Sequence, residues 1–289
     1  MSSFTATQNH MPPSDQLTGF LRSSWIIAQF ELIRLFGTAR GLLTLFTFAV
    51  IWYFMLTNLV MTAANFIEQN ASTRMSTMMF NSSGFGQLLA WPIAEFSAYW
   101  RIALYLFPVF AVLFAADQTA SDRDRGGLRF LTTRCSRDSI FLGRFIGQTI
   151  IVSFLVVGTL LTTLAVALYA HPAESWPMSF YCTLLIATNL LAVLMPYTAM
   201  MALLSASVRS PILAIILAVL LWTIVLWSVT ALSEYYPAFD FVKYIIPGIQ
   251  ISDLTQLQPA DTLSLIHIPL LQTAVLLIIG RFVMAKGAI

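Results

Sequence analysis

Charged residues are scarce in this chain of 289 residues. Only 10% of its residues are Asp, Glu, Lys or Arg, 58% are hydrophobic, and the mean hydropathy is +0.80. Soluble domains contain roughly 25% charged and 45–50% apolar residues. The composition therefore excludes an ordinary soluble domain and predicts a membrane protein. The formal net charge of only +2 gives no reason to expect a nucleic-acid partner.

Motifs for nucleotide and metal chemistry are also missing. No stretch reads GxxxxGK followed by Ser or Thr, so this chain should not bind ATP itself. HExxH and paired CxxC motifs are absent from the sequence as well. The only cysteines, Cys135 and Cys182, lie in a charged segment and in an apolar run, so we expect no disulfide. We therefore predict neither an enzyme nor a cofactor in this chain.

Three methionines, Met75, Met78 and Met79, are the one candidate for a soft metal site, because thioethers bind Cu(I). No Cys or His accompanies them. We interpret them as flexible apolar contacts at an interface. Copper binding is the alternative interpretation.

Six apolar runs are long enough to cross a bilayer, whose core about 30 Å thick needs about 20 helical residues. They predict an all-α membrane protein with a single transmembrane domain over 17–289 and a disordered tail over 1–16. The first run begins near Leu42, so we expect an uncleaved anchor and no signal peptide. The six predicted spans lie near 42–63, 100–116, 145–169, 180–205, 212–232 and 266–284.

Residues 17–38 are predicted to form a helix that lies along the inner membrane surface. An apolar stripe at helical spacing runs through Leu21, Trp25 and Ala28, whereas Arg22 and Glu31 keep the segment from spanning. An ordinary cytosolic helix packed on the bundle is the alternative.

Lys and Arg residues are distributed unevenly between the two sides. With the N-terminus inside, 12 of the 15 fall in cytoplasmic segments. This bias predicts that both termini are cytoplasmic, and we expect the cytoplasmic (inner) membrane of a bacterium. The outer segments 64–99 and 234–265 are too long for turns. The second contains Pro237, Pro247 and Pro259 and is predicted to re-enter the bilayer, which requires protein or water to cover its backbone.

The predicted spans contain almost no ionisable side chains. Ion-coupled transporters use buried charges along the transport path, so that class is disfavoured and the energy for any transport must arrive from outside the spans. The charged segment, residues 117–144, holds ten of the 28 charged residues. It is the largest predicted cytosolic surface between two spans and the place where a soluble partner can dock.

A short helix with charges on one side and apolar side chains on the other is predicted within the charged segment. Asp122 and Asp124 favour the positive end of a helix dipole, and Gly126-Gly127 weakens or ends the helix. A docking element for a soluble partner fits this pattern. A solvated loop whose arginines only fix the topology or touch anionic lipid fits it equally. The capping candidates are Thr119 and Ser121, and the apolar side chains are Leu128, Phe130 and Leu131.

The order of these residues resembles the first cytoplasmic loop of type-2 membrane (permease) subunits of ATP-binding-cassette (ABC) exporters. That family shows an acidic-Arg-acidic-x-Gly-Thr-Leu run, Ser-Arg after a Pro, and an aliphatic stretch ending in Gly-Lys. The matches are 122–128, 136–137 and 140–144, with Gly127, Arg134 and Arg144 in place of the usual Thr, Pro and Lys. Residues 207–211 resemble the family's Arg-Ser-Pro turn, and 244–247 its Tyr-x-x-Pro segment.

The resemblance implies six spans, a cytoplasmic coupling helix between spans 2 and 3, and re-entrant outer helices between spans 5 and 6. It implies that two permeases, a second copy or a homologue, bind two separate cytosolic P-loop ATPase subunits, which hold ATP and Mg²⁺. Residues 134–144 would be a topological anchor. The implied ATPase-subunit interface comprises Asp122, Arg123, Asp124, Arg125, Gly126, Gly127, Leu128, Phe130 and Leu131.

The leading hypothesis is thus the permease subunit of an ATP-driven exporter. The alternatives are an ABC permease that supports copper-enzyme maturation, a membrane-embedded lipid-modifying enzyme, and an ATP-independent channel. Uncharged spans suit a lipid, an amphipathic drug or peptide, or a polymer with a lipid anchor as substrate. Gly143 and Gly147, four residues apart, predict close helix packing but do not identify the neighbouring helix.

Overall fold

The computed structural model describes residues 13–71, 91–120, 122, 127–170, 176–236 and 242–286. Within these residues every regular element is a helix. In chain order they are α1 (Pro13–Phe36), α2 (Ala39–Phe54), the π-helical η1 (Met55–Val60), α3 (Met61–Ala71), α5 (Ala94–Ala115), α7 (Gly127–Thr132), α8 (Arg137–Ala170), α9 (Trp176–Ser207), α10 (Pro211–Tyr235), α11 (Ile251–Leu254), the 3₁₀ helix η4 (Pro259–Leu265) and α12 (His267–Lys286).

Six helical stretches are long and apolar enough to cross a membrane, and each contains or closely overlaps one predicted span. The prediction of six spans is therefore confirmed, although several helices extend beyond the apolar runs, because a helix continues for as long as its backbone hydrogen bonds are satisfied. The stretches are Ala39–Gln69, Ala94–Ala115, Arg137–Ala170, Trp176–Ser207, Pro211–Tyr235 and Pro259–Lys286.

Two helices around the first outer segment extend beyond the predicted spans. The first helical stretch does not end near residue 63, because η1 continues directly into α3 as far as Ala71. The second span begins at Ala94 rather than near residue 100. Its first turn contains Glu95, which favours the positive end of the helix dipole, and the Trp91-Pro92-Ile93 stretch precedes it.

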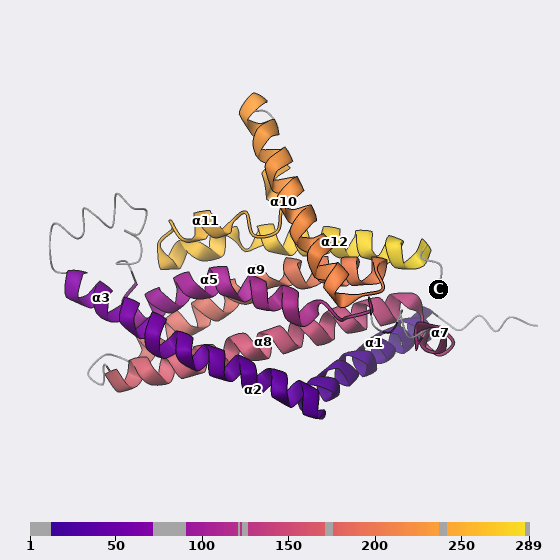
Figure 1. Cartoon of the computed structure of the whole chain (residues 1–289), viewed down its shortest axis with the longest axis horizontal. Helices are drawn as coiled ribbons and strands as arrows, with labels where there is room; N and C mark the ends of the chain where they lie inside the picture. Colours follow the sequence, from indigo (N-terminus) through magenta and orange to yellow (C-terminus); the bar gives the residue numbers. More distant parts are fainter. Residues whose placement is uncertain are drawn as a thin grey trace, which may run out of the picture.

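Helices α5, α8 and α9 form the centre of the bundle. Large side chains of α5 are completely buried there, and the Tyr99 hydroxyl lies 3.0 Å from the Thr159 hydroxyl of α8. Figure 1 shows α5, α8, α9 and α12 running along the long axis of the molecule, with α2 crossing them. The fully buried large side chains of this core include Phe96, Tyr99, Leu104, Phe107, Leu160, Ile186, Leu190 and Leu194.

One end of the molecule gathers the N-terminal part of α1, α7 and the C-terminal end of α12 (Figure 1). Side chains at the start of α8 connect it to α12. Arg137 donates to the Ala285 carbonyl at 3.0 Å, and Asp138 forms an ion pair with Arg281 at 2.8 Å. The described ends of the chain, Pro13 and Lys286, therefore belong to helices that reach the same end as the charged segment.

Helix α10 diverges from the rest of the bundle (Figure 1). Of its 25 residues, only Ala214 and Ala218 are buried. Both lie in its first half, where they pack against Ala115, Met201 and their neighbours. A strongly apolar helix thus presents most of its surface away from the chain's own core.

The segment from Val242 to Leu265 folds back onto the bundle. The side-chain amide of Gln272 in α12 donates to the carbonyls of Tyr244 and Ile246 at 2.7 and 3.0 Å. Asn189 in α9 donates to the Thr262 hydroxyl at 2.9 Å. These side chains satisfy backbone and hydroxyl groups that no regular helix satisfies, so irregular backbone can be held inside an apolar bundle.

Candidate functional site

The charged segment is partly described. Arg123, Asp124, Arg125 and Gly126 of the predicted ATPase-subunit interface lie outside the described residues. Gly127 and Leu128 begin the six-residue helix α7. Phe130 is 79% exposed. Leu131 is half-buried and packs against the cluster around Ile140 and Phe141. Among the described side chains, Phe130 is therefore the apolar group of α7 that points away from the bundle.

Asp122 reaches the bundle, although its side chain stays 34% exposed. Its carboxylate forms an ion pair with the guanidinium of Arg144 in α8. Arg144 is only 3% exposed. The sequence interpretation of Arg144 as part of a topological anchor does not describe this environment, because a buried guanidinium requires an anionic partner. Arg144 connects α8 to the charged segment.

A second set of polar contacts, centred on Glu31, lies beside the ion pair between Asp122 and Arg144. Glu31 of α1 is 2% exposed, forms an ion pair with Arg34 at 3.2 Å, and accepts a hydrogen bond from the Gln148 amide of α8 at 3.2 Å. Arg34 also donates to the carbonyl of Asp117 at 3.1 Å. Burial raises the pKa of Glu31 above its ordinary value of 4.5, while the charges of Arg34 and Arg144 oppose the shift.

We call these six residues the polar junction: Glu31, Arg34, Asp117, Asp122, Arg144 and Gln148. The junction brings together α1, the end of α5, the charged segment and α8. Sequence reasoning identified Asp122 but missed the roles of Glu31, Arg34 and Gln148. Gln148 lies four residues after Arg144, and Glu31 lies three before Arg34, so each pair shares a helix face. That spacing was the available signal.

Helix α1 packs closely against α8 at two glycines. A methyl group added at Gly143 would lie 2.6 Å from the Ser24 carbonyl oxygen and 2.8 Å from the Ile27 Cβ. At Gly147 it would lie 2.9 Å from the Glu31 Cβ. The predicted close packing at these glycines is confirmed, and α1 is the neighbour. The glycines allow the approach that brings Glu31 to Gln148.

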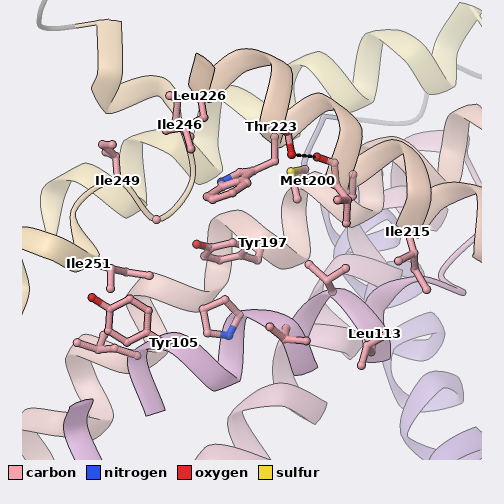
Figure 2. A pocket seen from close by; sticks show the side chains of 18 of the residues that line it. Tyr105, Leu113, Tyr197, Met200, Ile215, Thr223, Leu226, Ile246, Ile249 and Ile251 are labelled. Carbon is pink, nitrogen blue, oxygen red and sulfur yellow. Dashed lines mark hydrogen bonds between the residues drawn. The ribbon is translucent and has the colours of Figure 1, made fainter. Parts of the chain in front are cut away.

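An apolar cavity of about 580 Å³ lies between α5, α9, α10 and the turn at 246–252. Figure 2 shows side chains such as Tyr105, Leu113, Met200, Ile215 and Leu226 converging on it from these elements. The wall is almost entirely apolar. Such a space suits a hydrocarbon or an aromatic group and provides little for a charged solute.

The turn beside this cavity is fixed by two aromatic side chains. Tyr197 of α9 and Trp222 of α10 both donate to the carbonyl of Pro247, at 3.3 and 3.2 Å. Gly248 has φ +85°, and a side chain there would overlap the Tyr197 hydroxyl. Only glycine adopts that backbone conformation and leaves the space free.

Comparison with models of protein families shows which family this chain belongs to. A model of the ABC-2 family transporter proteins matches residues 20–285, nearly the whole chain. The chain belongs to the ABC-2 transporter family. It is a multi-pass membrane permease of an ABC transporter, as its resemblance to the type-2 subunits predicted. No curated protein matches the chain.

A metal-binding interpretation of this ABC-2 permease finds no support in the described residues. No group of three or more His, Cys, Asp or Glu residues there could hold a metal ion. Cys135 and Cys182 are both free. Met75, Met78 and Met79 lie outside the described residues. The notable polar assembly of the described permease is the polar junction, whose groups pair with one another.

Proposed function

We propose that this ABC-2 permease is the membrane subunit of an exporter driven by two separate cytosolic ATPase subunits. Those subunits would hold ATP and Mg²⁺, and the permease chain itself would be neither an enzyme nor a nucleotide-binding protein. A second permease copy or a homologue would complete the membrane part. Family membership supports the transport role, and the direction of transport rests on the resemblance to exporters.

Charge and architecture together support the proposed orientation. The end of the bundle that carries α7 also carries the starts of α1 and α8 and the end of α12 (Figure 1). The positive-inside bias of the sequence assigns this end to the cytoplasm. Both termini would then be cytoplasmic, and the membrane would be the inner membrane of a bacterium. The large exposed side chains of α1, among them Trp25, Phe30 and Ile33, favour its lying at the inner surface of that membrane.

The observation that carries the coupling proposal is the ion pair between Asp122 and Arg144. Because Arg144 is buried in α8, a force on the charged segment reaches a membrane-spanning helix through a short and specific connection. The hydrogen bond between Glu31 and Gln148 extends the connection to α1. We infer that α7 is the coupling helix and that Phe130 docks in an apolar recess of the ATPase, because its ring is 79% exposed on the side of α7 that points away from the bundle.

The segment Val242–Thr255 would be the re-entrant element. Pro247 contacts Trp222, which lies halfway along α10, and Tyr197, which lies ten residues before the end of α9, or about 15 Å at 1.5 Å per residue. Contacts at this depth favour a segment that dips into the bilayer under protein cover. The exposed face of α10 and the neighbouring apolar cavity then leave room for the second permease and for the apolar part of a substrate.

A lipid, an amphipathic drug or peptide, or a polymer with a lipid anchor fits that cavity, since its lining is apolar. Each of these substrates would place hydrocarbon against α5, α9 and α10. We propose this substrate class rather than a small ionic solute, because the spans offer few charges to a path.

Purification of the tagged permease from its host tests the coupling proposal. We expect a P-loop ATPase, identified by mass spectrometry, to remain bound to the wild-type chain. Phe130→Asp should release it, because a carboxylate would enter an apolar recess without a partner, and Phe130→Leu should retain it. Tyr169→Asp is the matched control, since Tyr169 is 90% exposed at the other end of α8.

Equal recovery of the ATPase with Phe130→Asp and with wild type would refute docking through α7. If no ATPase accompanies the wild-type chain, and ATP hydrolysis in membranes is independent of the permease, the proposal of ATP coupling fails as a whole.

A further inference from the structure

The apolar cavity between α5 and α10 is an elongated slot. On α10 its lining runs from Ile215 to Leu226, eleven residues further on, which is about 16 Å at 1.5 Å per residue. This length is close to one leaflet of a hydrocarbon core about 30 Å thick. The lining residues of α10 recur at helical spacing, so a single face of this helix forms the wall. They are Ile215, Ala218, Val219, Trp222, Thr223 and Leu226.

Protein closes the slot at both ends. At one end, Ala214 and Ala218 of α10 pack against Ala115 and Met201. Ala115 is the last residue of α5, which leads into the charged segment, so this end lies on the side of α7. At the opposite end, Figure 2 shows the isoleucines of the turn at 246–252 beside the cavity. A ligand that lies along the slot therefore stops at this turn.

The slot opens sideways, between α5 and α10. Tyr105, Val109 and Leu113 follow one another at intervals of four residues along α5, and each is more than half exposed. Val219 of α10 is exposed as well. Both helices are candidate membrane spans, so this mouth lies at the depth of the hydrocarbon layer and not in water.

The polar groups in the wall are already engaged. The hydroxyls of Thr223 and Ser252 donate to backbone carbonyls at 2.8 and 3.1 Å. Tyr197 and Trp222 both donate to the turn, at 3.3 and 3.2 Å. The Tyr105 ring, which is half exposed, stands at the mouth. A hydrocarbon chain suits this wall, because it neither needs a hydrogen bond nor takes a partner away from these groups.

The size of the slot distinguishes a single chain from a helix of another subunit. A helix with its side chains is about 10–12 Å across, so a 16 Å length of it fills on the order of 1,200 Å³, about twice the 580 Å³ of the cavity. An extended hydrocarbon chain, with bonds of about 1.5 Å and angles of about 111°, advances about 1.25 Å per carbon. About 13 carbons then span the slot, which is most of one lipid tail.

We propose that this slot binds one acyl chain of a bilayer lipid, which enters sideways from the leaflet on the α7 side and ends against the turn at 246–252. Lipid tails are as apolar as the wall, so the chain is held because an empty slot would forfeit dispersion contacts along its length. The proposal rests on the proposed orientation only for the identity of the leaflet, which would be the cytoplasmic one. It needs no ATPase subunit.

Photolabelling of the purified full-length chain in phosphatidylcholine vesicles tests the site. A small share of the lipid carries a diazirine on one acyl chain, either at the chain end or next to the carbonyl group, and mass spectrometry locates the labelled residues. We expect the diazirine at the chain end to label Trp222 and the turn at 246–252. The diazirine next to the carbonyl group should label Leu113 and Ile215 instead. This comparison uses the wild-type chain alone and so needs no variant to fold.

Two variants on α10 then test the slot itself. Val219→Trp should abolish labelling of the turn, because its indole fills the slot from the mouth. Val225→Trp is the matched control, since Val225 is also exposed on α10 but does not line the slot, and it should leave labelling of the turn unchanged. Trp227, exposed on the same helix, reports ordinary contact with surrounding lipid and should be labelled equally in all three chains.

Several results would overturn the proposal. Equal labelling of the turn by the two diazirines would show ordinary lipid contact without a chain aligned in the slot. Unchanged labelling in Val219→Trp would do so too, as would an equal loss in Val225→Trp. A wild-type turn that is never labelled, with conversion of a dimer to a monomer by Val219→Trp, would assign the slot to a second copy of the chain. The expected labelling in a chain that binds no ATPase would support the lipid site while refuting ATP coupling.

Discussion

The contact between α1 and α8 leads to a sharp prediction about one methyl group. Gly143→Ala places a Cβ 2.6 Å from the Ser24 carbonyl oxygen and 2.8 Å from the Ile27 Cβ. The first atom is helix backbone and the second is fixed by a β-branched side chain, so neither moves without a shift of α1. Gly158→Ala, in the same helix, meets nothing within 4 Å.

These two substitutions should change stability in opposite directions. Replacing glycine by alanine inside a helix contributes about 1 kcal/mol of stability, and both variants have this gain. Overpacking costs about 1–3 kcal/mol, and two contacts below 3.0 Å place Gly143→Ala near the upper limit. We expect a net loss of about 2 kcal/mol at Gly143 and a gain of up to about 1 kcal/mol at Gly158.

Equilibrium unfolding of the two variants and the wild type in SDS–detergent mixtures, followed by tryptophan fluorescence, measures this difference. Trp25 lies on α1 one residue after Ser24 and makes the fluorescence sensitive to separation of α1 from α8. Gly143→Ala should also reduce ATP-driven transport, because a shift of α1 separates Glu31 from Gln148. If the two variants have the same stability, the close packing inferred at Gly143 is incorrect.

Three further predictions concern the turn beside the apolar cavity and the polar junction. Gly248→Ala should destabilise the fold by at least about 1–2 kcal/mol, the cost of a left-handed backbone at a residue with a side chain. In a double-mutant cycle, adding Tyr197→Phe should recover only the part of the loss that comes from the overlap with the Tyr197 hydroxyl. A Gly248→Ala variant as stable as the wild type would contradict the backbone φ of +85° at this position. Burial raises the pKa of Glu31, so the folded state binds the Glu31 proton more tightly than the unfolded state does. Protonation of Glu31 therefore stabilises the fold. This stabilisation is complete below pH 4.5 and is lost as the pH rises through the higher pKa of the folded state. Thermal unfolding should therefore show the stability of Glu31→Gln relative to wild type rising with pH across that window, and a difference independent of pH would count against it. Asp122→Asn should cost about 1–3 kcal/mol, because it leaves the buried Arg144 without its anion while solvent still reaches the Asp122 side of the pair. The double variant Asp122→Asn with Arg144→Gln should recover much of the loss in stability while transport stays impaired. Additive losses would show that the pair is not coupled.

Much of the fold was predictable because the signals for it are local. Each predicted span is an apolar run, and the transfer of a helix into lipid depends on the residues of that run. The boundaries near residues 63 and 100 were not predictable in this way. The helix that contains α3 and the start of α5 both extend into polar or mixed sequence, where hydrogen bonding rather than hydrophobicity decides where a helix ends.

The candidate site was likewise predictable from the sequence only in part. The sequence singled out the charged segment and Phe130, since a polar stretch between two spans stands out by composition. It suggested a place for Asp122 at a partner's surface, whereas the structure turns Asp122 onto Arg144. Glu31 and Gln148 gave only the weak signal of shared helix faces. Their partners could not be identified from helical periodicity alone.

By itself, the sequence determined the membrane class of the protein and the number and approximate position of its candidate spans. It also pointed to the charged segment, where we propose that a soluble partner docks. These properties depend on hydrophobicity and charge summed over neighbouring residues. The tertiary structure decided which charges pair and which helix lies against Gly143 and Gly147. Glu31 and Gln148 are 117 residues apart, and Asp122 and Arg144 are 22 apart. A buried charge accepts any partner of suitable chemistry. The packing of α1 on α8 brings Glu31 to Gln148, and the fold of the charged segment onto α8 brings Asp122 to Arg144.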